Sequence, residues 1–471
     1  MDRGELSAAS IRALGEQFMA TLTHVAVALA GADLETVERE VQGALRPVLG
    51  AVVEQVVAAR VAAQPQRRPR CASCGQRMRL VEAQRSRALQ GLVGEYAIVR
   101  PYYGCDTCHH GVAPVDALLG LGPGSLSPSL SRVACRLGIE VSFPEAADVL
   151  AETLGVTVPD EGIRRITEGI GAVAEAEAQA AVQRAVAGLE PLESAAVTQP
   201  PPAAVMVAVD GVMVHEADGW HECKVGVVAA LGPAVRRDPE SGREQLALGP
   251  AQYCAGFEPA ERFWYRVYVE ASRGGLGRPP LSLIVVLGDG ADWIWRGART
   301  FLGVGAVEVV EIVDFFHAVE HLWGVANSVF GAGGAQAAAW AEQRKEQLFT
   351  QGVAPILTAL EALAVAGDAA DVVRKAHAYF SDHAARMNYP AFVARHLPIG
   401  SGVVESACKT LIQAREKGAG MCWSRGGAQA VATLRAVQRS GRWQPFWTTH
   451  PQHRRPPVFP RRVRPPAQQA A

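Results

Sequence analysis

Two apolar runs decide the fold: AVMVAVD at residues 204–210 and LSLIVVLGD at residues 281–289. Both are rich in β-branched residues, and each ends in an aspartate, Asp210 in the first run and Asp289 in the second. Apolar runs of this length, bounded by turn residues, predict buried strands. Two further strand patterns, HECKVGVVAAL at 221–231 and REQLALGPAQYCAG at 243–256, follow the first run directly. The sequence therefore predicts a buried sheet with a carboxylate at the end of two of its strands.

The order of the elements around these runs indicates the architecture of the second half of the chain. After three predicted strands come a helix near residues 258–272, the strand at 281–289, a short helix at 291–303 and a strand at 306–314. Three strands followed by alternating helix and strand are the order of an RNase H-like core. Residues 318–397 carry helical patterns rich in alanine, so we expect an all-α insertion within that core.

A third acid, Glu405, begins a predicted helix after the turn at 400–402. An aspartate at a strand end is held rigidly, whereas a glutamate on a helix has the reach to approach from the side. The three carboxylates could therefore meet at one sheet edge and hold two Mg²⁺ or Mn²⁺ ions about 4 Å apart, with Asp210 bridging both. We predict Asp210, Asp289 and Glu405 as catalytic metal ligands. The alternative is that an aspartate after a strand is only a turn residue.

Four of the nine cysteines form two C-x-x-C pairs, Cys71 with Cys74 and Cys105 with Cys108. Each pair can place two sulfurs on one tetrahedral zinc, and the stretch between them alternates like short strands, which is typical of a zinc ribbon. A redox dithiol needs only one pair, so structural Zn²⁺ is favoured. His109 and His110 could replace a ligand, although exposure to solvent is the better interpretation. We expect the other five cysteines to fill space in the core: Cys135, Cys223, Cys254, Cys408 and Cys422.

Helical patterns dominate residues 5–63 and 125–186. In the first region apolar residues recur at intervals of three and four residues, which predicts two helices. Asp33 is a candidate N-cap for the second of them. In the other region a short helix, a tight turn and a helix carrying Arg164 and Arg165 near its start fit a helix-turn-helix unit. An ordinary helical bundle would have the same pattern.

The charge distribution permits DNA binding although the net charge is only -1. Residues 60–100 contain nine arginines and two acids, and residues 435–471 contain eight arginines and no acid. Local basic surface is what phosphate contact requires, although both segments could simply be solvated. No run reaches the length of about 18 apolar residues that a membrane helix needs, so we expect a cytoplasmic, nucleoid-associated protein without a membrane partner.

Four ordered blocks resemble the signature blocks of bacterial insertion-sequence transposases of the ISKra group, DDE enzymes akin to the Mutator-like superfamily. They are VAVDGV, VVLGDGADWIW, DFFHAVEHLW and LPIGSGVVESACKTLIQAREKGAGMCWS, and the likeness runs from the cysteine region to about Arg439. The resemblance implies that Asp210, Asp289 and Glu405 are the catalytic acids. It also implies that Asp314 and His317 match an Asp-x-x-His signature, for which we favour structural support over catalysis.

The candidate DNA contacts are less specific. Trp293, Trp295 and Trp423 could stack on bases or anchor the core; we favour the core for Trp295 and a DNA contact for Trp423. Glu416 interrupts the basic run that precedes Trp423, which weakens tight phosphate binding there. The predicted DNA-binding residues are Arg164, Arg165, Lys409, Arg415, Lys417 and Trp423.

We therefore predict a multidomain α+β protein, an RNase H-like catalytic core with an all-α insertion, preceded by a zinc ribbon and a helix-turn-helix. It would bind terminal inverted repeats and target DNA, at least as a homodimer, and cut and join strands. The alternatives are a domesticated nuclease without strand transfer and a zinc-dependent DNA-binding regulator. The predicted segments are 1–66 (N-terminal helices), 67–120 (zinc ribbon), 121–190 (helix-turn-helix region), 191–204 (linker), 205–317 and 398–440 (core), 318–397 (insertion) and 441–471 (basic, disordered tail).

Overall fold

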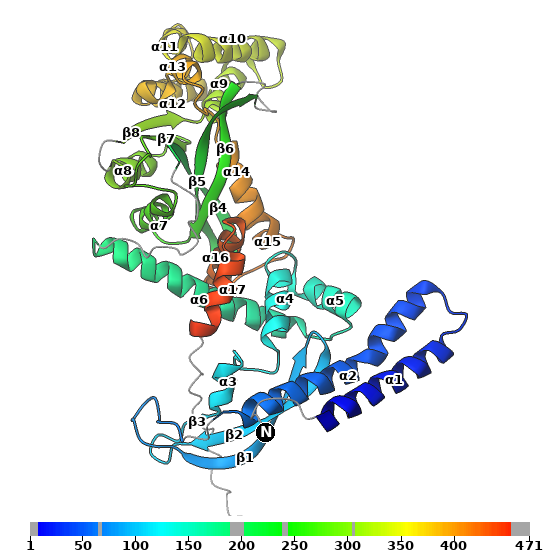
Figure 1. Cartoon of the computed structure of the whole chain (residues 1–471). Helices are drawn as coiled ribbons and strands as arrows, with labels where there is room; N and C mark the ends of the chain where they lie inside the picture. Colours follow the sequence, from blue (N-terminus) through cyan, green and yellow to red (C-terminus); the bar gives the residue numbers. More distant parts are fainter. Residues whose placement is uncertain (1–7, 65–67, 189–201, 238–243, 304–306, 454–471) are drawn as a thin grey trace, which may run out of the picture. The chain divides into compact units, whose positions relative to one another are not determined.

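The computed structural model of the chain describes residues 8–64, 68–188, 202–237, 244–303 and 307–453 (Figure 1). Their fold is mixed α+β, as predicted, and the chain divides into two compact units. The first unit holds residues 1–167 together with the segment from 446 onward, and the second holds residues 168–445. No helix in the described ranges has both the length and the apolar character needed to span a bilayer.

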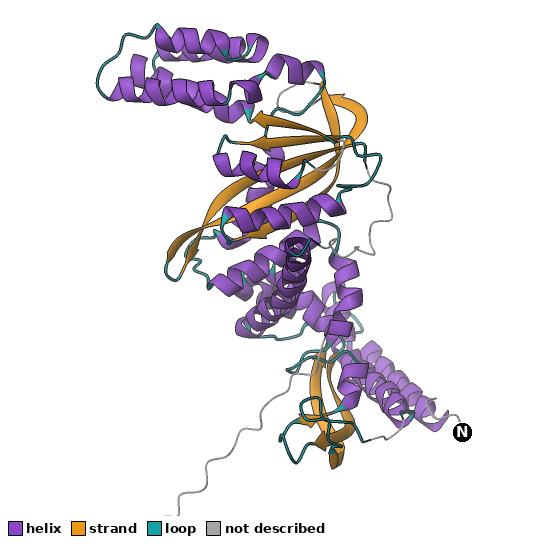
Figure 2. Ribbon diagram, turned by 90° about the vertical axis from the view of Figure 1, so that its left-hand side faces the viewer, coloured by secondary structure: helices purple, strands orange, loops and turns teal. Residues whose placement is uncertain are grey.

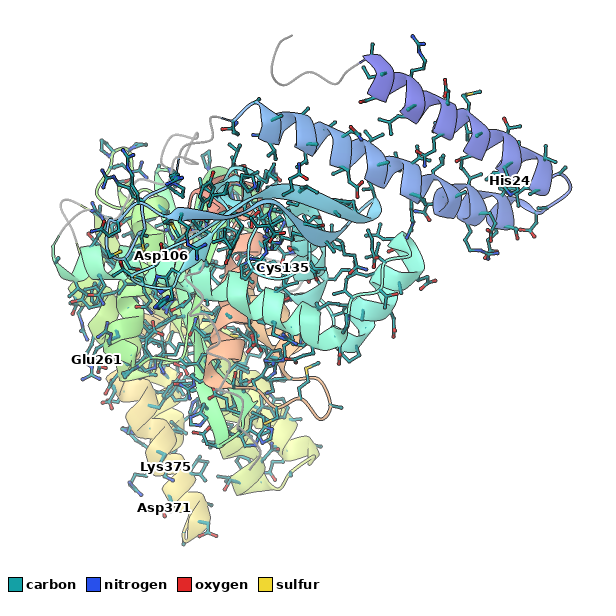
Figure 3. The ribbon with its side chains drawn as sticks, turned by 90° about the horizontal axis from the view of Figure 1, so that it is seen from below. His24, Asp106, Cys135, Glu261, Asp371 and Lys375 are labelled. Carbon is teal, nitrogen blue, oxygen red and sulfur yellow. The ribbon has the colours of Figure 1, made fainter. Side chains whose placement is uncertain are left out.

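The first unit begins with two long helices, α1 (Ala8–Ala28), which carries the His24 labelled in Figure 3, and α2 (Leu34–Ala62). Asp33 caps α2 as predicted, because its carboxylate accepts the backbone N–H of Thr36 at 2.8 Å. An antiparallel sheet follows, with strand order β1 (Arg79–Gly91), β2 (Gly94–Gly104) and β3 (Gly111–Val112). The paired cysteines lie at the ends of these strands.

Four helices continue the chain: α3 (Pro114–Leu118), α4 (Pro128–Gly138), α5 (Phe143–Leu154) and α6 (Asp160–Val186). The hydroxyls of Ser127 and Ser142 cap α4 and α5, each of which has proline in its first turn. Leu130, Leu150 and Ile163 are fully buried in one apolar cluster, so α4, α5 and the start of α6 share a core. The helical pattern predicted over residues 125–186 is confirmed.

The second unit is built on a five-stranded mixed sheet, which Figure 2 shows with helices packed around it. Its strands lie in the order β6 (Glu244–Gly256), β5 (Gly219–Arg237), β4 (Ala204–Glu216), β7 (Leu283–Gly288) and β8 (Glu308–Val313). The pairs β4–β5 and β5–β6 are antiparallel, and β4–β7 and β7–β8 are parallel. The two apolar runs that predicted the sheet thus become neighbouring parallel strands in its centre.

Helices cover both faces of this sheet. On one face lie α7 (Ala260–Arg273) and α8 (Asp292–Phe301); a Cβ built on Gly226 of β5 would contact Phe263 and Val267 of α7. Asp210 pairs with Val225, the residue that precedes Gly226 in β5. Neighbouring residues of a strand point to opposite faces, so the Asp210 side chain lies on the face opposite α7, where it meets Cys408. That face carries α14 (Gly402–Ala407), a π-helical turn η2 (Cys408–Gln413), α15 (Ala414–Glu416) and α16 (Arg425–Arg439).

The segment between β8 and α14 is helical, as predicted for the insertion. Its elements are α9 (Phe315–Phe330), α10 (Ala335–Gln351), α11 (Ala354–Glu361), α12 (Asp368–Asp382), η1 (Ala384–Met387) and α13 (Tyr389–Ala394). Small side chains let α9 and α10 approach closely, because Ala326, Ala337 and Ala341 form one buried cluster. Hydrogen bonds from α12 and at the start of α9 connect the insertion to the loops that carry the second and third predicted acids.

The later part of α6 joins the second unit by packing on α7 and α16. A Cβ built on Gly171 would lie 2.6 Å from the carbonyl oxygen of Ala430 in α16, so only glycine permits this approach. Beside it, the Glu175 carboxylate accepts bonds from Arg266 of α7 at 3.0 Å and from Thr433 of α16 at 2.7 Å. These buried hydrogen bonds connect α6 to α7 and to α16.

Several details differ from the prediction. The predicted tail begins with a helix, α17 (Trp443–His453), because Phe446 and Trp447 supply a buried apolar face that the basic and proline-rich composition concealed. The predicted helix that carries Glu405 is interrupted by the π turn η2. Cys422 is exposed and does not fill a core, whereas the other four unpaired cysteines are buried. Most of the predicted linker, residues 189–201, and the tail beyond 453 lie outside the described residues.

Candidate active site and cysteine site

Two of the predicted catalytic acids lie just beyond the paired part of two neighbouring parallel strands. Asp289 directly follows β7, as predicted, whereas Asp210 lies inside β4, which continues to Glu216 because its pairing with β5 continues. The pairing of β4 with β7 runs from Ala204 opposite Leu283 to Ala208 opposite Leu287. Asp210 and Asp289 each follow two residues after the last pair, and parallel strands present their carboxyl ends at the same edge. Adjacent strands lie about 4.8 Å apart. The two aspartates are therefore brought together by the topology of the sheet.

Asp210 occupies the most enclosed position among the three acids. Its Oδ1 accepts the backbone N–H of Gly211 at 2.7 Å, and the Cys408 thiol donates to Oδ2 at 3.6 Å. Burial raises the pKa of Asp210, and the negative charges of Asp289 and Glu405 raise it further. The Asp210 carboxylate therefore lies within reach of the charges of both other predicted acids.

The Asp289 side chain is exposed, and two hydrogen bonds hold the residue in place. Its Oδ1 accepts the N–H of Ala291 at 2.9 Å, and its carbonyl oxygen accepts the Tyr379 hydroxyl at 3.0 Å. Tyr379 lies on α12 of the helical insertion and stacks on His321 with ring centroids 3.9 Å apart. Burial raises the pKa of Tyr379 and the charge of Asp289 adds to the shift, so the phenol stays protonated and donates. The insertion therefore fixes the loop that carries the second acid.

Glu405 is linked to Asp314 through one serine. The Ser401 hydroxyl donates to Glu405 Oε1 at 3.1 Å, while the Ser401 backbone N–H donates to Asp314 Oδ2. Asp314 is buried, and its other oxygen caps α9 by accepting the backbone N–H of His317 at 2.7 Å. The His317 ring itself lies beside Glu320, with Nδ1 3.3 Å from its carboxylate. These contacts are structural and connect α9 to the loop before Glu405.

The three acids differ from a compact metal site. Among the described residues, two groups of three or more potential ligands have all their ligand atoms within 4.8 Å, and the acids are in neither group. Two ions about 4 Å apart, each completed by water and phosphate oxygens, need a wider spread of carboxylates than one ion does. The charges of Asp289 and Glu405, which both raise the pKa of Asp210, are compatible with such a spread.

The four paired cysteines form the compact group. The sulfurs of Cys71, Cys74, Cys105 and Cys108 all lie within 4.8 Å of one another, with Cys74 and Cys105 at 3.5 Å. This geometry can hold one tetrahedral zinc ion. Hydrogen bonds from the backbone N–H groups of Cys74 and Ser73 lower the pKa of Cys71 to about 6, which favours the thiolate that a metal needs.

Both cysteine pairs adopt the same local fold. The N–H of Gly75 bonds to the carbonyl of Cys71 at 2.9 Å, and the N–H of His109 bonds to the carbonyl of Cys105 at 2.9 Å. Gly75 and His109 both have positive φ, 72° and 56°, which is uncommon for a residue such as histidine. His109 therefore has a backbone role in the turn, and the donor set consists of four sulfurs.

The predicted DNA contacts fall into two classes. Arg164 and Arg165 at the start of α6 both bond to Glu161, at 2.7 and 3.1 Å, and Lys409 and Lys417 are exposed. These four residues are on the surface, and their contact with DNA stays a prediction.

Arg415 and Trp423 do not meet the expectation of a DNA contact. Their exposed fractions are 1% and 7%, the guanidinium lies 4.8 Å from the centre of the indole, and Trp423 Nε1 donates to the carbonyl of Glu416 at 3.1 Å. The π turn places this end of the helix against the sheet, so both side chains belong to the core. Trp295 is buried as predicted, with 1% exposed.

Three residues of the site were missed by sequence reasoning. Tyr379 carries no local signal, because its partner Asp289 is 90 residues away in the chain. Cys408 was assigned to the core although its thiol bonds to Asp210. Ser401 had a usable signal, since a serine four residues before a helical glutamate lies within hydrogen-bonding reach of it.

No model of a known protein family matches this chain, and a search of curated proteins finds no match.

Proposed function

We propose that this chain is a DNA transposase of the DDE type, which cuts the ends of a mobile element and joins them to target DNA. The observation that carries the proposal is that β4 and β7, the strands of Asp210 and Asp289, are parallel neighbours, and that the charges of Asp289 and Glu405 both raise the pKa of Asp210. The strand order, three antiparallel strands followed by two parallel ones, supports an RNase H-like core.

The residues around the acids suit metal-dependent phosphoryl transfer. Two Mg²⁺ ions, when bound, would activate the attacking oxygen and steady the leaving oxygen. Asp210 would bridge the ions, with Gly211 and Cys408 holding its two oxygens. Asp289 would be positioned by Tyr379, and Glu405 by Ser401. The chain thus supplies fixed carboxylates, and catalysis would come from positioning and charge neutralisation.

The first unit would supply DNA recognition. Its four-cysteine site would hold structural Zn²⁺, and the surface arginines at the start of α6 would face phosphate groups. Terminal repeats of the element are the proposed partner, and pairing of two ends requires at least a dimer.

A mobility assay tests the proposal. The gene with its genomic flanks and a resistance marker is placed on a donor plasmid, and transfer of the marker to a target plasmid is counted in a bacterial host. Asp210→Asn, Asp289→Asn and Glu405→Gln should each reduce transfer at least about 100-fold, because each removes a charge that the transition state needs. Asp292→Asn is the matched control, since Asp292 is exposed three residues from Asp289.

Purified proteins separate transfer from cleavage. Labelled DNA spanning the gene boundaries is incubated with Mg²⁺, and both cut ends and joined products are measured. Cleavage without joining would identify a nuclease, and retention of DNA without cleavage would identify a regulator. Equal activity of all four variants would refute the assignment of the acids.

A further inference from the structure

A second group of metal-ligating side chains lies on the turn between β4 and β5. One ligand atom each from Glu216, Asp218 and His221 lies within 4.8 Å of the others, and these residues belong neither to the four-cysteine site nor to the proposed active site. The donor set is one imidazole nitrogen and two carboxylate oxygens. It therefore differs in chemistry from a patch of acidic residues, which offers oxygen alone.

The strand register explains why these side chains meet. Glu216 pairs with Gly219 and Val214 pairs with His221, so Glu216 and His221 point to the same face of the hairpin. Gly219 has no side chain, and a Cβ built there would have no neighbour within 4 Å, which leaves room between the two ligands. Asp218 closes the group from the turn, with Oδ1 2.9 Å from His221 Nε2.

Glu216 supplies an independent sign of a missing partner. Only 2% of the residue is exposed, and Oε2 accepts a bond from Arg425 Nε at 2.7 Å. Within the described residues, Oε1 is buried and has no hydrogen-bond partner. A buried carboxylate oxygen without a partner costs about 1–3 kcal/mol or more, and a bound cation would remove that cost.

A pocket borders part of the group. Its walls are Glu216, Ala217, Asp218, Trp423, Ser424 and Arg425. The Asp218 side chain is exposed and that of His221 is partly exposed, so water could complete the coordination of an ion on their side. Arg425 engages one oxygen of Glu216 and leaves the other for the ion, so Glu216 would bind through a single oxygen.

We propose that Glu216, Asp218 and His221 form a binding site for a divalent transition-metal ion of the Zn²⁺ class. Three protein ligands of mixed nitrogen and oxygen type, with a further position open to water, are the coordination that Zn²⁺ accepts outside closed cysteine sites. The ion would bind directly to the His221 ring and to both carboxylates, and would fix the turn beside Trp423. The site stands on its own geometry, and does not depend on the proposed transposase activity.

Zinc stoichiometry tests the site in the full-length protein. Equilibrium dialysis against Zn²⁺, in excess Mg²⁺ to occupy sites made of carboxylates alone, is followed by metal analysis. The wild-type protein should bind one ion in the four-cysteine site and one more at the turn. His221→Ala should lose the second ion and keep the first, and Asp218→Asn should weaken the second by at least about tenfold.

The chain offers a matched control. His377 lies on α12, the helix that carries the Asp371 and Lys375 labelled in Figure 3. Its Nε2 is 3.1 Å from Glu361 Oε1. Among the described residues, no third potential ligand joins this pair to form a group. His377→Ala should bind as many ions as the wild type. Loss of an ion in this variant, or retention of both ions in His221→Ala, would overturn the proposal.

A second measurement uses the unmodified protein, so it does not depend on the folding of any variant. Diethylpyrocarbonate labels exposed imidazoles, and mass spectrometry reports the labelling rate of each histidine. Zn²⁺ should slow the labelling of His221 at least about tenfold and leave His377 unchanged. Equal rates for His221 with and without Zn²⁺ would refute the site, whatever the outcome of the DNA assays.

Discussion

Replacing Glu175 with alanine should destabilise the second unit strongly. Glu175 lies on α6 and accepts bonds from Arg266 of α7 and from Gln429 and Thr433 of α16. The Arg266 side chain is only 5% exposed and has one other carboxylate partner, Glu258. The substitution would leave the buried Arg266 guanidinium paired with Glu258 and no longer with residue 175.

The size of the effect follows from the burial of the pair. Breaking a buried ion pair by removing one partner costs about 3–5 kcal/mol. The lower end applies here, because Glu258 stays and because Gln429 and Thr433 can still bond to each other at 3.0 Å. We therefore expect the free energy of unfolding to fall by about 3 kcal/mol, which lowers the urea midpoint by about 1 M if the m-value is about 3 kcal/mol per molar.

The effect should depend on pH with a definite sign. Burial by itself would raise the pKa of Glu175, but the bonds and charge of Arg266 outweigh burial and lower it. The contribution of Glu175 is therefore complete above the unfolded pKa of about 4.3 and is lost as the pH falls through the lower folded value. The difference between the wild type and Glu175→Ala should narrow below about pH 4.3.

Tryptophan fluorescence during urea unfolding measures the change. Every tryptophan of the chain except Trp447 lies between residues 168 and 445, so the signal reports on the second unit. Glu346→Ala, at an exposed position of α10, is the control and should change stability by less than about 0.5 kcal/mol. A midpoint for Glu175→Ala that equals the control would show that the buried ion pair adds nothing, and the reasoning would be wrong.

Three further changes test other parts of the structure. Cys74→Ser should remove zinc from the four-cysteine site, as measured by metal analysis, and should lower the melting temperature followed by circular dichroism; unchanged zinc content would contradict the site. Gly297→Ala should lower the free energy of unfolding by about 1–3 kcal/mol, as measured by urea unfolding. The new Cβ would lie 2.0 Å from Trp264 Nε1, and that indole is held by a hydrogen bond to the carbonyl of Trp293. An unchanged free energy of unfolding would mean that the ring can move. Mg²⁺-dependent cleavage should decline as the pH falls through the raised pKa of Asp210, because the protonated acid cannot bind the ion; a rate that stays flat until the ordinary aspartate pKa of about 3.9 would contradict that shift.

The central strands and the four-cysteine cluster could be predicted because their signals are local. Apolar β-branched runs ending at Asp210 and Asp289 became adjacent parallel strands, and the C-x-x-C pairs became one sulfur cluster. The helical patterns over residues 5–63 and 125–186 are local signals of the same kind, and helices form there. In each case the pattern that predicts the element lies within the element itself.

The features that sequence analysis did not predict depend mostly on contacts between residues that are distant in the chain. Tyr379 reaches Asp289 across 90 residues, and no pattern near either residue indicates that bond. Arg415 follows the pattern of a surface cation, yet it is buried, and its guanidinium lies over the ring of Trp423. The helix α17 was missed because arginine and proline dominate the composition around a few buried aromatic residues.

The π turn over Cys408–Gln413 has a consequence for insertions and deletions. A π turn contains one residue more than the α-helix it interrupts, so removing a single residue such as Lys409 would restore a regular helix. Everything on the N-terminal side would then rotate by about 100° and shift by about 1.5 Å relative to α15. Glu405 would swing away from Asp210 although no acid had been altered. The length of this short segment is therefore a constraint separate from residue identity. Under the proposed function, deleting one residue there should abolish DNA cleavage as completely as Glu405→Gln.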